Sequence, residues 1–469
     1  MTSRFSFLTV LALCAVPFGL PAQTYFDTNG TSTGYGVYTG TTLDGNFWTS
    51  TDGGTSPTGA FPGGDPTVVF SIDENSFTSF GDTIDAGALT SFDIGGLDWR
   101  FVGSTLPDNR RNGLNGNGID LNVVNGSTFD ISPTSVNDDL FIEDWVINGS
   151  FTKTGLGSLQ FRENTINGTI TFAAGNAALG DTSGHDYGAD SIFNVTSGTL
   201  NVNGPGDFTV GGFTGGGDIS NSGGGGSTSA TITFSGTGTT NFSGTLLDHP
   251  NGGSGIRNLA KSGSGTQIFS GDLETEGTTT ITNGVFAVDG THSSAGQYTV
   301  SGGQLAGSGT IETATGGNTQ NDDIIINGGE LAPGRDGTVG TLTLTLGTGT
   351  LDLTNVGSGT LLFDLGATTD LVAVNSSITL DNLEFSDFTF TELPGLSVGT
   401  YDLFTSSSLN GSLGANLNGG IGSAWTGTLQ ASGSDIQLVV DAIPEPSSVL
   451  YLLGGLSGLL LVRRRRQTS

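Results

Sequence analysis

The chain has 469 residues and a formal net charge of −31, from 44 acidic and 13 basic side chains. Such an excess of negative charge repels phosphate backbones, which excludes nucleic acid as a partner. The one cysteine, Cys14, lies in the apolar start of the chain, so the remainder has no disulfide and no thiolate metal site. The 81 glycines and the scarcity of helix-forming residues favour short strands and turns.

The N-terminal segment has the pattern of a secretory signal. Arg4 supplies a positive charge, Phe5 to Phe18 form an apolar stretch, and Pro21-Ala22 place a small residue before the expected cleavage. The sequence therefore predicts residues 1–22 as a signal peptide and the body of the protein as exported across the inner membrane.

Residues 23–103 are expected to form a β-rich cap on the strands that follow. This segment contains Trp48, the turn sequence Asp52-Gly53-Gly54 and the run from Asp65 to Phe70, which has strand-forming residues. A cap is expected because the open end of a stack of strands exposes unpaired backbone groups and favours aggregation.

Residues 104–350 alternate between apolar and polar side chains in short runs separated by glycine. Examples are Thr231-Ile232-Thr233-Phe234 and the run from Leu342 to Leu346. A period of two with β-branched residues predicts strands that each bury one face. The patterning argues against disorder, which high glycine content alone would permit.

Two phrases recur within this region. The first is a lysine followed by two spaced glycines, and its copies are Lys153, Gly155, Gly157 and Lys261, Gly263, Gly265. The second runs from Gly302 to Ala306 and returns from Gly328 to Ala332. The interval between its copies suits one turn of a β-solenoid, in which each rung adds short strands and glycines occupy the corners.

Residues 351–441 continue the alternation without the repeated phrases. The segment from Gly399 to Phe404 has a strand pattern, and a second β-rich cap is expected here. The sequence contains no series of strands of about 10 residues that would end the chain in a membrane barrel.

The tail, residues 442–469, combines three features in a fixed order. Pro444-Glu445-Pro446 is followed by an apolar segment, predicted as a single transmembrane helix over residues 447–462, and then by the stop sequence Arg463, Arg464, Arg465, Arg466. Clustered arginines favour the cytoplasmic side, so the preceding body is expected outside the membrane.

Pro444, Glu445 and Pro446, with the apolar and arginine segments, resemble the PEP-CTERM sorting signal of Gram-negative bacteria. The resemblance covers under a tenth of the chain. It implies an exosortase-type sorting enzyme as a partner, transient anchoring in the inner membrane, and then removal of the tail, with release or attachment at the cell surface. The alternative is a plain single-span anchor preceded by a proline-rich linker.

The lysine–glycine phrase resembles the autotransporter-associated β-strand repeat, and the segment from Leu259 to Val288 matches it better than the segment from Phe151 to Phe172. The resemblance covers about half of the body. It implies a right-handed parallel β-helix and brings no catalytic residues with it. The expected fold class is therefore all-β, a right-handed β-solenoid with β-rich caps and a single C-terminal hydrophobic helix.

The residues that could serve an enzyme are scattered along the sequence. The three histidines lack a partner at metal-ligand spacing, and we expect them in surface loops: His185, His249 and His292. Neighbouring carboxylates suit acid–base chemistry in principle, namely Asp138-Asp139, Glu143-Asp144 and Asp322-Asp323. A polysaccharide lyase would need a base and a cationic cluster, and the candidates are Lys153, Lys261, Arg100, Arg110 and Arg111.

No cofactor or dedicated metal site is expected. The turn from Asn115 to Asp120 is faintly similar to calcium-binding glycine-rich turns, but it occurs once. Corners rich in Asp and Asn are compatible with loose calcium binding at extracellular concentrations.

These observations predict an exported, non-catalytic structural or adhesion protein of the cell surface or of a biofilm matrix. Its expected partners are extracellular polysaccharide or other surface proteins, with the membrane contacted through the C-terminal segment. The alternative is an extracellular polysaccharide lyase or hydrolase on a β-helix scaffold.

Overall fold

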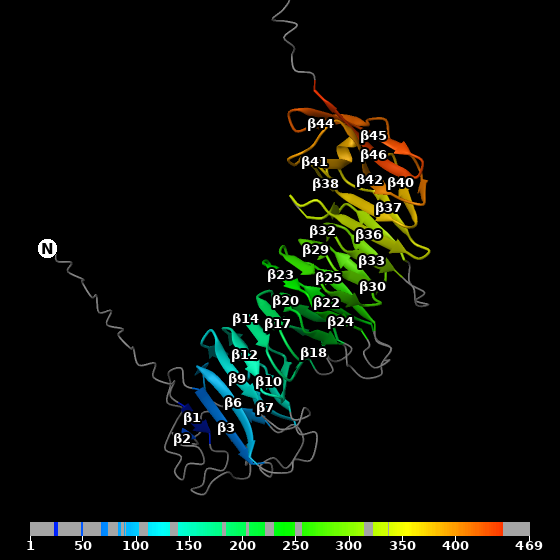
Figure 1. The fold of residues 1–469 in the computed structure, drawn as a ribbon. Coiled ribbons are helices and arrows are strands. Elements are labelled where there is room, and N and C mark those ends of the chain that lie inside the picture. Colours follow the sequence, from blue (N-terminus) through cyan, green and yellow to red (C-terminus); the bar gives the residue numbers. More distant parts are fainter. Residues whose placement is uncertain are drawn as a thin grey trace, which may run out of the picture.

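The computed structural model describes residues 23–26, 48–49, 67–73, 83–85, 89, 91–102, 111–131, 139–180, 184–202, 206–220, 229–248, 256–313, 322–335 and 337–443. Within these ranges almost every element is a β-strand, and the helical element is one 3-10 turn, η1 (Phe385–Asp387). Successive strands run round three sides of an elongated stack (Figure 1). The described part of the chain thus confirms the predicted all-β fold of stacked parallel strands.

Sheet I forms the first side and is parallel except where β1 meets β2. Its strands are β1 (Gln23–Phe26), β2 (Trp48–Thr49), β3 (Thr67–Asp73), β6 (Gly96–Val102), β9 (Ser127–Ile131), β12 (Phe151–Thr154), β14 (Thr165–Phe172), β17 (Ser191–Val195), β20 (Gly212–Gly215), β23 (Thr239–Phe242), β26 (Thr266–Phe269), β29 (Val285–Val288), β32 (Gln304–Gly307), β35 (Glu330–Pro333), β38 (Leu361–Leu365) and β41 (Phe388–Glu392).

Sheet II forms the second side and ends in antiparallel strands. Its strands are β4 (Thr83–Asp85), β7 (Arg111–Asn115), β10 (Asp139–Glu143), β13 (Ser158–Arg162), β15 (Asn176–Leu179), β18 (Thr199–Val202), β21 (Asp218–Ser220), β24 (Thr245–Leu247), β27 (Asp272–Glu274), β30 (Thr291–Ala295), β33 (Thr310–Thr313), β36 (Thr341–Leu346), β39 (Leu371–Val374), β42 (Gly399–Thr405), β44 (Asn418–Ile421), β45 (Trp425–Ser432) and β46 (Asp435–Ala442).

Sheet III forms the third side and is parallel throughout its described strands. These are β16 (His185–Asp186), β19 (Phe208–Val210), β22 (Ala230–Phe234), β25 (Arg257–Lys261), β28 (Thr279–Ile281), β31 (Tyr298–Val300), β34 (Ile324–Asn327), β37 (Thr350–Asn355), β40 (Ser377–Leu380) and β43 (Ser408–Asn410). In the N-terminal rungs this side is made by β5 (Ser91–Ile94), β8 (Asp120–Val123), β11 (Val146–Asn148) and the start of β14.

Each recurring glycine phrase corresponds to one rung of the stack. Gln304 of β32 pairs with Glu330 of β35, so the predicted interval from Gly302 to Gly328 is one full turn. One rung earlier the turn is shorter, because Val285 already pairs with Gln304. Rungs differ in length because the connection from β33 to β34 is longer than that from β30 to β31.

The corner between sheets I and II consists of glycines stacked on one another. A Cβ atom built on Gly244, Gly271 or Gly290 would lie 1.8, 2.1 or 2.0 Å from the carbonyl oxygen of a glycine in the preceding rung. A side chain therefore does not fit, and backbone packs directly on backbone. This close approach requires glycine at these corner positions.

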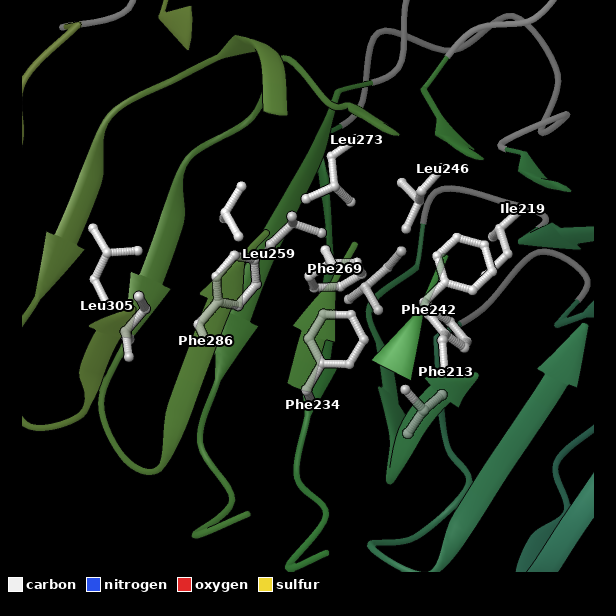
Figure 2. Packing of buried hydrophobic residues seen from close by; sticks show 14 of the residues in the cluster. Phe213, Ile219, Phe234, Phe242, Leu246, Leu259, Phe269, Leu273, Phe286 and Leu305 are labelled. Atoms are coloured by element: carbon white, nitrogen blue, oxygen red, sulfur yellow. The ribbon is translucent and has the colours of Figure 1, made fainter. Parts of the chain in front are cut away.

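The interior is filled by the inward-facing residues of all three sides, many of them aromatic (Figure 2). Phe213 and Phe234 have ring centroids 5.5 Å apart, as do Phe234 and Phe269, and Phe286 lies 5.1 Å from Phe269. Each of these four side chains is at most 1% exposed. Aromatic pairs contribute about 0.5–1.5 kcal/mol each beyond their buried area, so neighbouring rungs are strongly coupled.

The parallel stack extends beyond the predicted limits of 104 and 350. Parallel pairing already joins β3 to β6, and it continues to the pair β40 and β43. Residues 351–410 keep the period-two pattern but lack the glycine phrases. The absence of these phrases led to the prediction of a separate cap from residue 351. The C-terminal cap is formed by the antiparallel strands β46, β45 and β44, while β42 still pairs in parallel with β39 and meets β46 on its other edge.

The cap closes the stack with aromatic residues. Phe388 and Phe390 stack with centroids 5.3 Å apart, and Phe385 lies 5.3 Å from Phe390. The indole Nε1 of Trp425 donates to Glu392 at 2.9 Å. Strands β44 and β45 pack against Phe385, because a Cβ atom on Gly419 or Gly427 would lie 2.1 or 2.9 Å from its ring.

Both targeting segments, residues 1–22 and 444–469 with the predicted helix 447–462, lie outside the described residues. Within the described ranges, the structure has no helix that is both long and apolar enough to span a membrane.

Candidate binding face

The outer face of sheet III carries a column of small residues that crosses consecutive rungs. The strand register places Thr209, Thr233, Ala260, Thr280 and Thr299 side by side on β19, β22, β25, β28 and β31. All five are partly exposed, while both sequence neighbours of each are buried. Because neighbouring strands lie about 4.8 Å apart, the column presents one small side chain at each such step.

This column, here called the threonine column, is uncharged over several rungs of a strongly acidic protein. It continues through Ile325 and is bounded by Asp186 on β16 and Asp352 on β37. The hydroxyls of Thr233 and Thr280 form no hydrogen bond with another described residue. They are therefore available to a ligand as donors and acceptors.

The aspartates beside the threonine column have a structural role. Asp207 accepts a bond from the backbone N–H of Thr231 at 2.8 Å, and Asp323 accepts one from Thr350 at 2.8 Å. Each bond joins one rung to the next. Asp323 belongs to one of the predicted carboxylate pairs, and here it anchors backbone.

The N-terminal rungs carry a second polar column on the same side. The side-chain amide of Asn122 donates to Asp93 at 2.6 Å, Asn148 donates to Asn122 at 3.1 Å, and Asn167 donates to Asn148 at 2.8 Å. The four residues occupy equivalent positions on β5, β8, β11 and β14. Because each amide is bonded to its neighbour, this ladder stabilises the stack directly.

Lys153, the first repeat lysine, is buried at the end of β12 and is 0% exposed. Its Nζ donates to the carbonyl oxygens of Gly155 at 2.8 Å and Ala174 at 2.7 Å, and also to that of Gly157. Burial lowers the pKa of Lys153 to about 8, against the opposing effect of Asp130. The ammonium thus supplies hydrogen atoms to three carbonyl groups of a tight corner.

Lys261, the second repeat lysine, has the same local arrangement. It is 2% exposed at the end of β25, donates to the carbonyl of Gly263, and has its pKa lowered to about 8 by burial. The following glycine, Gly265, donates its N–H to Gly236 of the preceding rung at 2.9 Å.

The two lysine corners lie on different edges of the solenoid. Lys153 precedes the corner from sheet I to sheet II, whereas Lys261 precedes the corner from sheet III to sheet I. In both, a glycine of the next rung closes over the ammonium: Gly175 at φ +67° and Gly284 at φ +63°. The lysine–glycine phrase does not include these two glycines, although both lie about one rung after their lysine.

The two described histidines, His185 and His292, are buried in different strands, β16 and β30. His292 is fully buried in β30, where its Nε2 contacts Thr275 Oγ1 at 2.8 Å and its Nδ1 contacts the Tyr298 hydroxyl. Burial lowers the pKa of His292 to about 4, partly offset by the bond to the Thr275 backbone. His185 is also buried, in β16, so the prediction of surface loops is wrong for both. His249 lies outside the described residues.

The other predicted sites are spread along the stack. Glu143 and Asp144 accept backbone bonds from Gly116 and Gly118 through their carbonyl groups, so the turn from Asn115 to Asp120 packs beside them. A Cβ on Gly116 would lie 2.4 Å from the Trp145 ring. Among the described residues, no three His, Cys, Asp or Glu side chains form a group suited to a metal ion.

The remaining predicted residues are placed in strands or lie outside the described ranges. Arg100 is in β6, Arg111 in β7 and Asp139 in β10. Outside the described ranges are Asp138, Arg110, Pro444, Glu445, Pro446, Arg463, Arg464, Arg465 and Arg466. No family model matches the chain, and no curated protein matches it.

Proposed function

We propose that this protein is an exported, non-catalytic structural or adhesion protein that acts at the cell surface or in an extracellular matrix. The observation that carries the proposal is the threonine column, an uncharged and regularly spaced face on an otherwise acidic stack. The proposal includes a right-handed coil, export through residues 1–22, and sorting through the Pro444-Glu445-Pro446 tail by an exosortase-type enzyme.

The proposed ligand is an extended extracellular polysaccharide lying along the stack. Its hydroxyl groups pair well with threonine hydroxyls, and an uncharged face does not repel an anionic polymer. One such hydrogen bond contributes only about 0.5–1.5 kcal/mol. Contacts on consecutive rungs nevertheless add through effective concentration, because the first contact holds the polymer near the next hydroxyl.

The buried lysines also favour a non-catalytic role. A lyase base must reach a substrate proton, and Lys153 and Lys261 instead hold carbonyl groups inside the corners. The carboxylate of Asp323 is bonded to the next rung.

Binding of purified protein to matrix polysaccharides tests the proposal, with and without calcium. The double variant Thr233→Glu/Thr280→Glu places two charges on the threonine column and is expected to weaken binding at least about tenfold. The control is Thr245→Glu/Thr291→Glu, because these residues are partly exposed on the outer face of sheet II.

Equal binding by the two double variants would contradict the assignment of the face. Failure of the unmodified protein to bind any matrix glycan would contradict the binding role as a whole. Sorting is tested separately by mass spectrometry of the C-terminus in membrane, surface and medium fractions. Termination near Pro444 would support it, and an intact chain through Ser469 confined to the inner membrane would contradict it.

A further inference from the structure

Asp364 and Asp370 form a clasp at the corner between β38 and β39. Asp370 Oδ1 accepts a bond from the backbone N–H of Gly340 at 2.7 Å, and Oδ2 accepts one from the N–H of Asp364 at 2.7 Å. The N–H of Asp370 returns a bond to the carbonyl of Asp364 at 3.0 Å. The Asp370 carboxyl therefore joins its own rung to the preceding one.

Both carboxyl groups are removed from water. Asp364 is 5% exposed although it occupies an outward position on β38, and Asp370 is 2% exposed. The Oδ2 atom of Asp364 is buried and has no hydrogen-bond partner among the described residues. A buried, ionised carboxylate with an unpaired oxygen is strongly unfavourable.

The charged residues around the clasp are engaged elsewhere. Arg335, on the turn after β35, pairs with Asp289 at 2.9 Å. Glu330 of β35 accepts from Gln304, and Glu392 of β41 accepts from Trp425. Strands β36 and β39 contribute no charged residue. Within the described surroundings, a proton is the remaining way to offset two neighbouring negative charges.

We propose that the clasp formed by Asp364 and Asp370 binds one proton at neutral pH, and that this proton makes the corner a pH-sensitive lock on the rungs beneath the C-terminal cap. The proton comes from solvent and returns to it, so no other reactant is needed. A proton on the clasp removes one of two buried negative charges, and it belongs to the pair rather than to either residue alone.

The burial of Asp370 determines the direction in which stability changes with pH. Burial raises the pKa of Asp370 to about 7, the charge of Asp364 acts in the same direction, and the two backbone N–H groups oppose it. In the unfolded chain an aspartate ionises near pH 4. The stabilising contribution is therefore complete below about pH 4 and is lost as the pH rises through about 7.

The test compares Asp364→Asn with the unmodified full-length protein by urea unfolding between pH 4 and 9. Asparagine removes one of the two buried charges, so the variant is expected to reduce the pH response of this corner. At pH 8 its folding equilibrium constant should exceed that of the unmodified protein at least about tenfold, and the curves should converge in acid. The control is Asp381→Asn, which removes an exposed carboxylate from the turn after β40.

Three outcomes would overturn the proposal. One is an Asp364→Asn variant with the pH slope of the control, and another is a variant less stable than the unmodified protein at pH 8. The third is calcium stabilising the unmodified protein at pH 8 but not Asp364→Asn, which would make the pair a cation site. Asp248, whose pKa is also raised to about 7 by burial, lies several rungs away. Its contribution to the pH dependence of stability is therefore the same in both proteins and cancels in the comparison.

Discussion

Replacing Gly244 by alanine should open the corner between sheets I and II. The new Cβ would start 1.8 Å from the carbonyl oxygen of Gly217, whereas real Cβ contacts essentially never fall below 3.0 Å, so the two rungs must move apart by at least the difference. The neighbouring bond from Ser243 N–H to the Gly215 carbonyl, now 2.7 Å, would then be broken. Overpacking costs about 1–3 kcal/mol and the lost bond about 1 kcal/mol, which gives a loss of about 2–4 kcal/mol.

The matched control is Gly238→Ala in a corner of the same rung. A Cβ at Gly238 would meet no atom within 4 Å, and neither glycine has a positive φ. The control should be neutral or slightly stabilising, because alanine restricts the unfolded chain. Urea unfolding gives the two free energies, and amide hydrogen exchange shows whether protection is lost first at β23 and β24. Two variants within about 1 kcal/mol of each other would refute the view that glycine is needed for contact between rungs.

Three further substitutions address the buried polar groups. Lys153→Met keeps the length of the side chain but leaves three carbonyl groups without a donor, so urea unfolding should show a loss of about 2–4 kcal/mol. Lys261→Met should cost less because fewer carbonyl groups depend on that ammonium, and the reverse order would contradict this reasoning. Because the pKa of His292 is lowered to about 4, the folded ring stays neutral while the unfolded ring takes up a proton below about pH 6.5. Stability should therefore fall from pH 6.5 toward 4 through this group, and His292→Leu should abolish that part of the slope measured by urea unfolding.

The fold was predictable because the patterns that specify it, alternation within a strand and the spacing of glycine phrases, can be read from short stretches of sequence. Alternation such as that from Leu342 to Leu346 specifies a strand with one buried face, and the interval between Gly302 and Gly328 gave the length of a rung that the pairing of Gln304 with Glu330 confirms. The position of each strand around the axis was less accessible. The Lys153 and Lys261 phrases both encode a strand, a tight turn and a strand, and nothing in either phrase states which edge it occupies.

The buried polar residues were missed for a related reason. His292 lies in the sequence Thr291-His292-Ser293-Ser294, which has the composition of a loop, yet the register aligns His292 with Leu273 and Ile311 in the interior. Its partner Tyr298 lies on the next strand, β31, which belongs to sheet III. A pattern of side chains within one strand does not show which polar residue will find a partner on another side of the solenoid.

The candidate face and the clasp at Asp364 illustrate opposite uses of polar residues in one stack. Inside the corners, Lys153 and Asp370 bond to backbone groups, so their substitution is expected to change stability. Thr233 and Thr280 make no side-chain bond within the described residues, so their substitution should leave stability almost unchanged. A loss of binding without a loss of stability at these two positions would therefore identify the threonine column as a functional surface rather than as part of the scaffold.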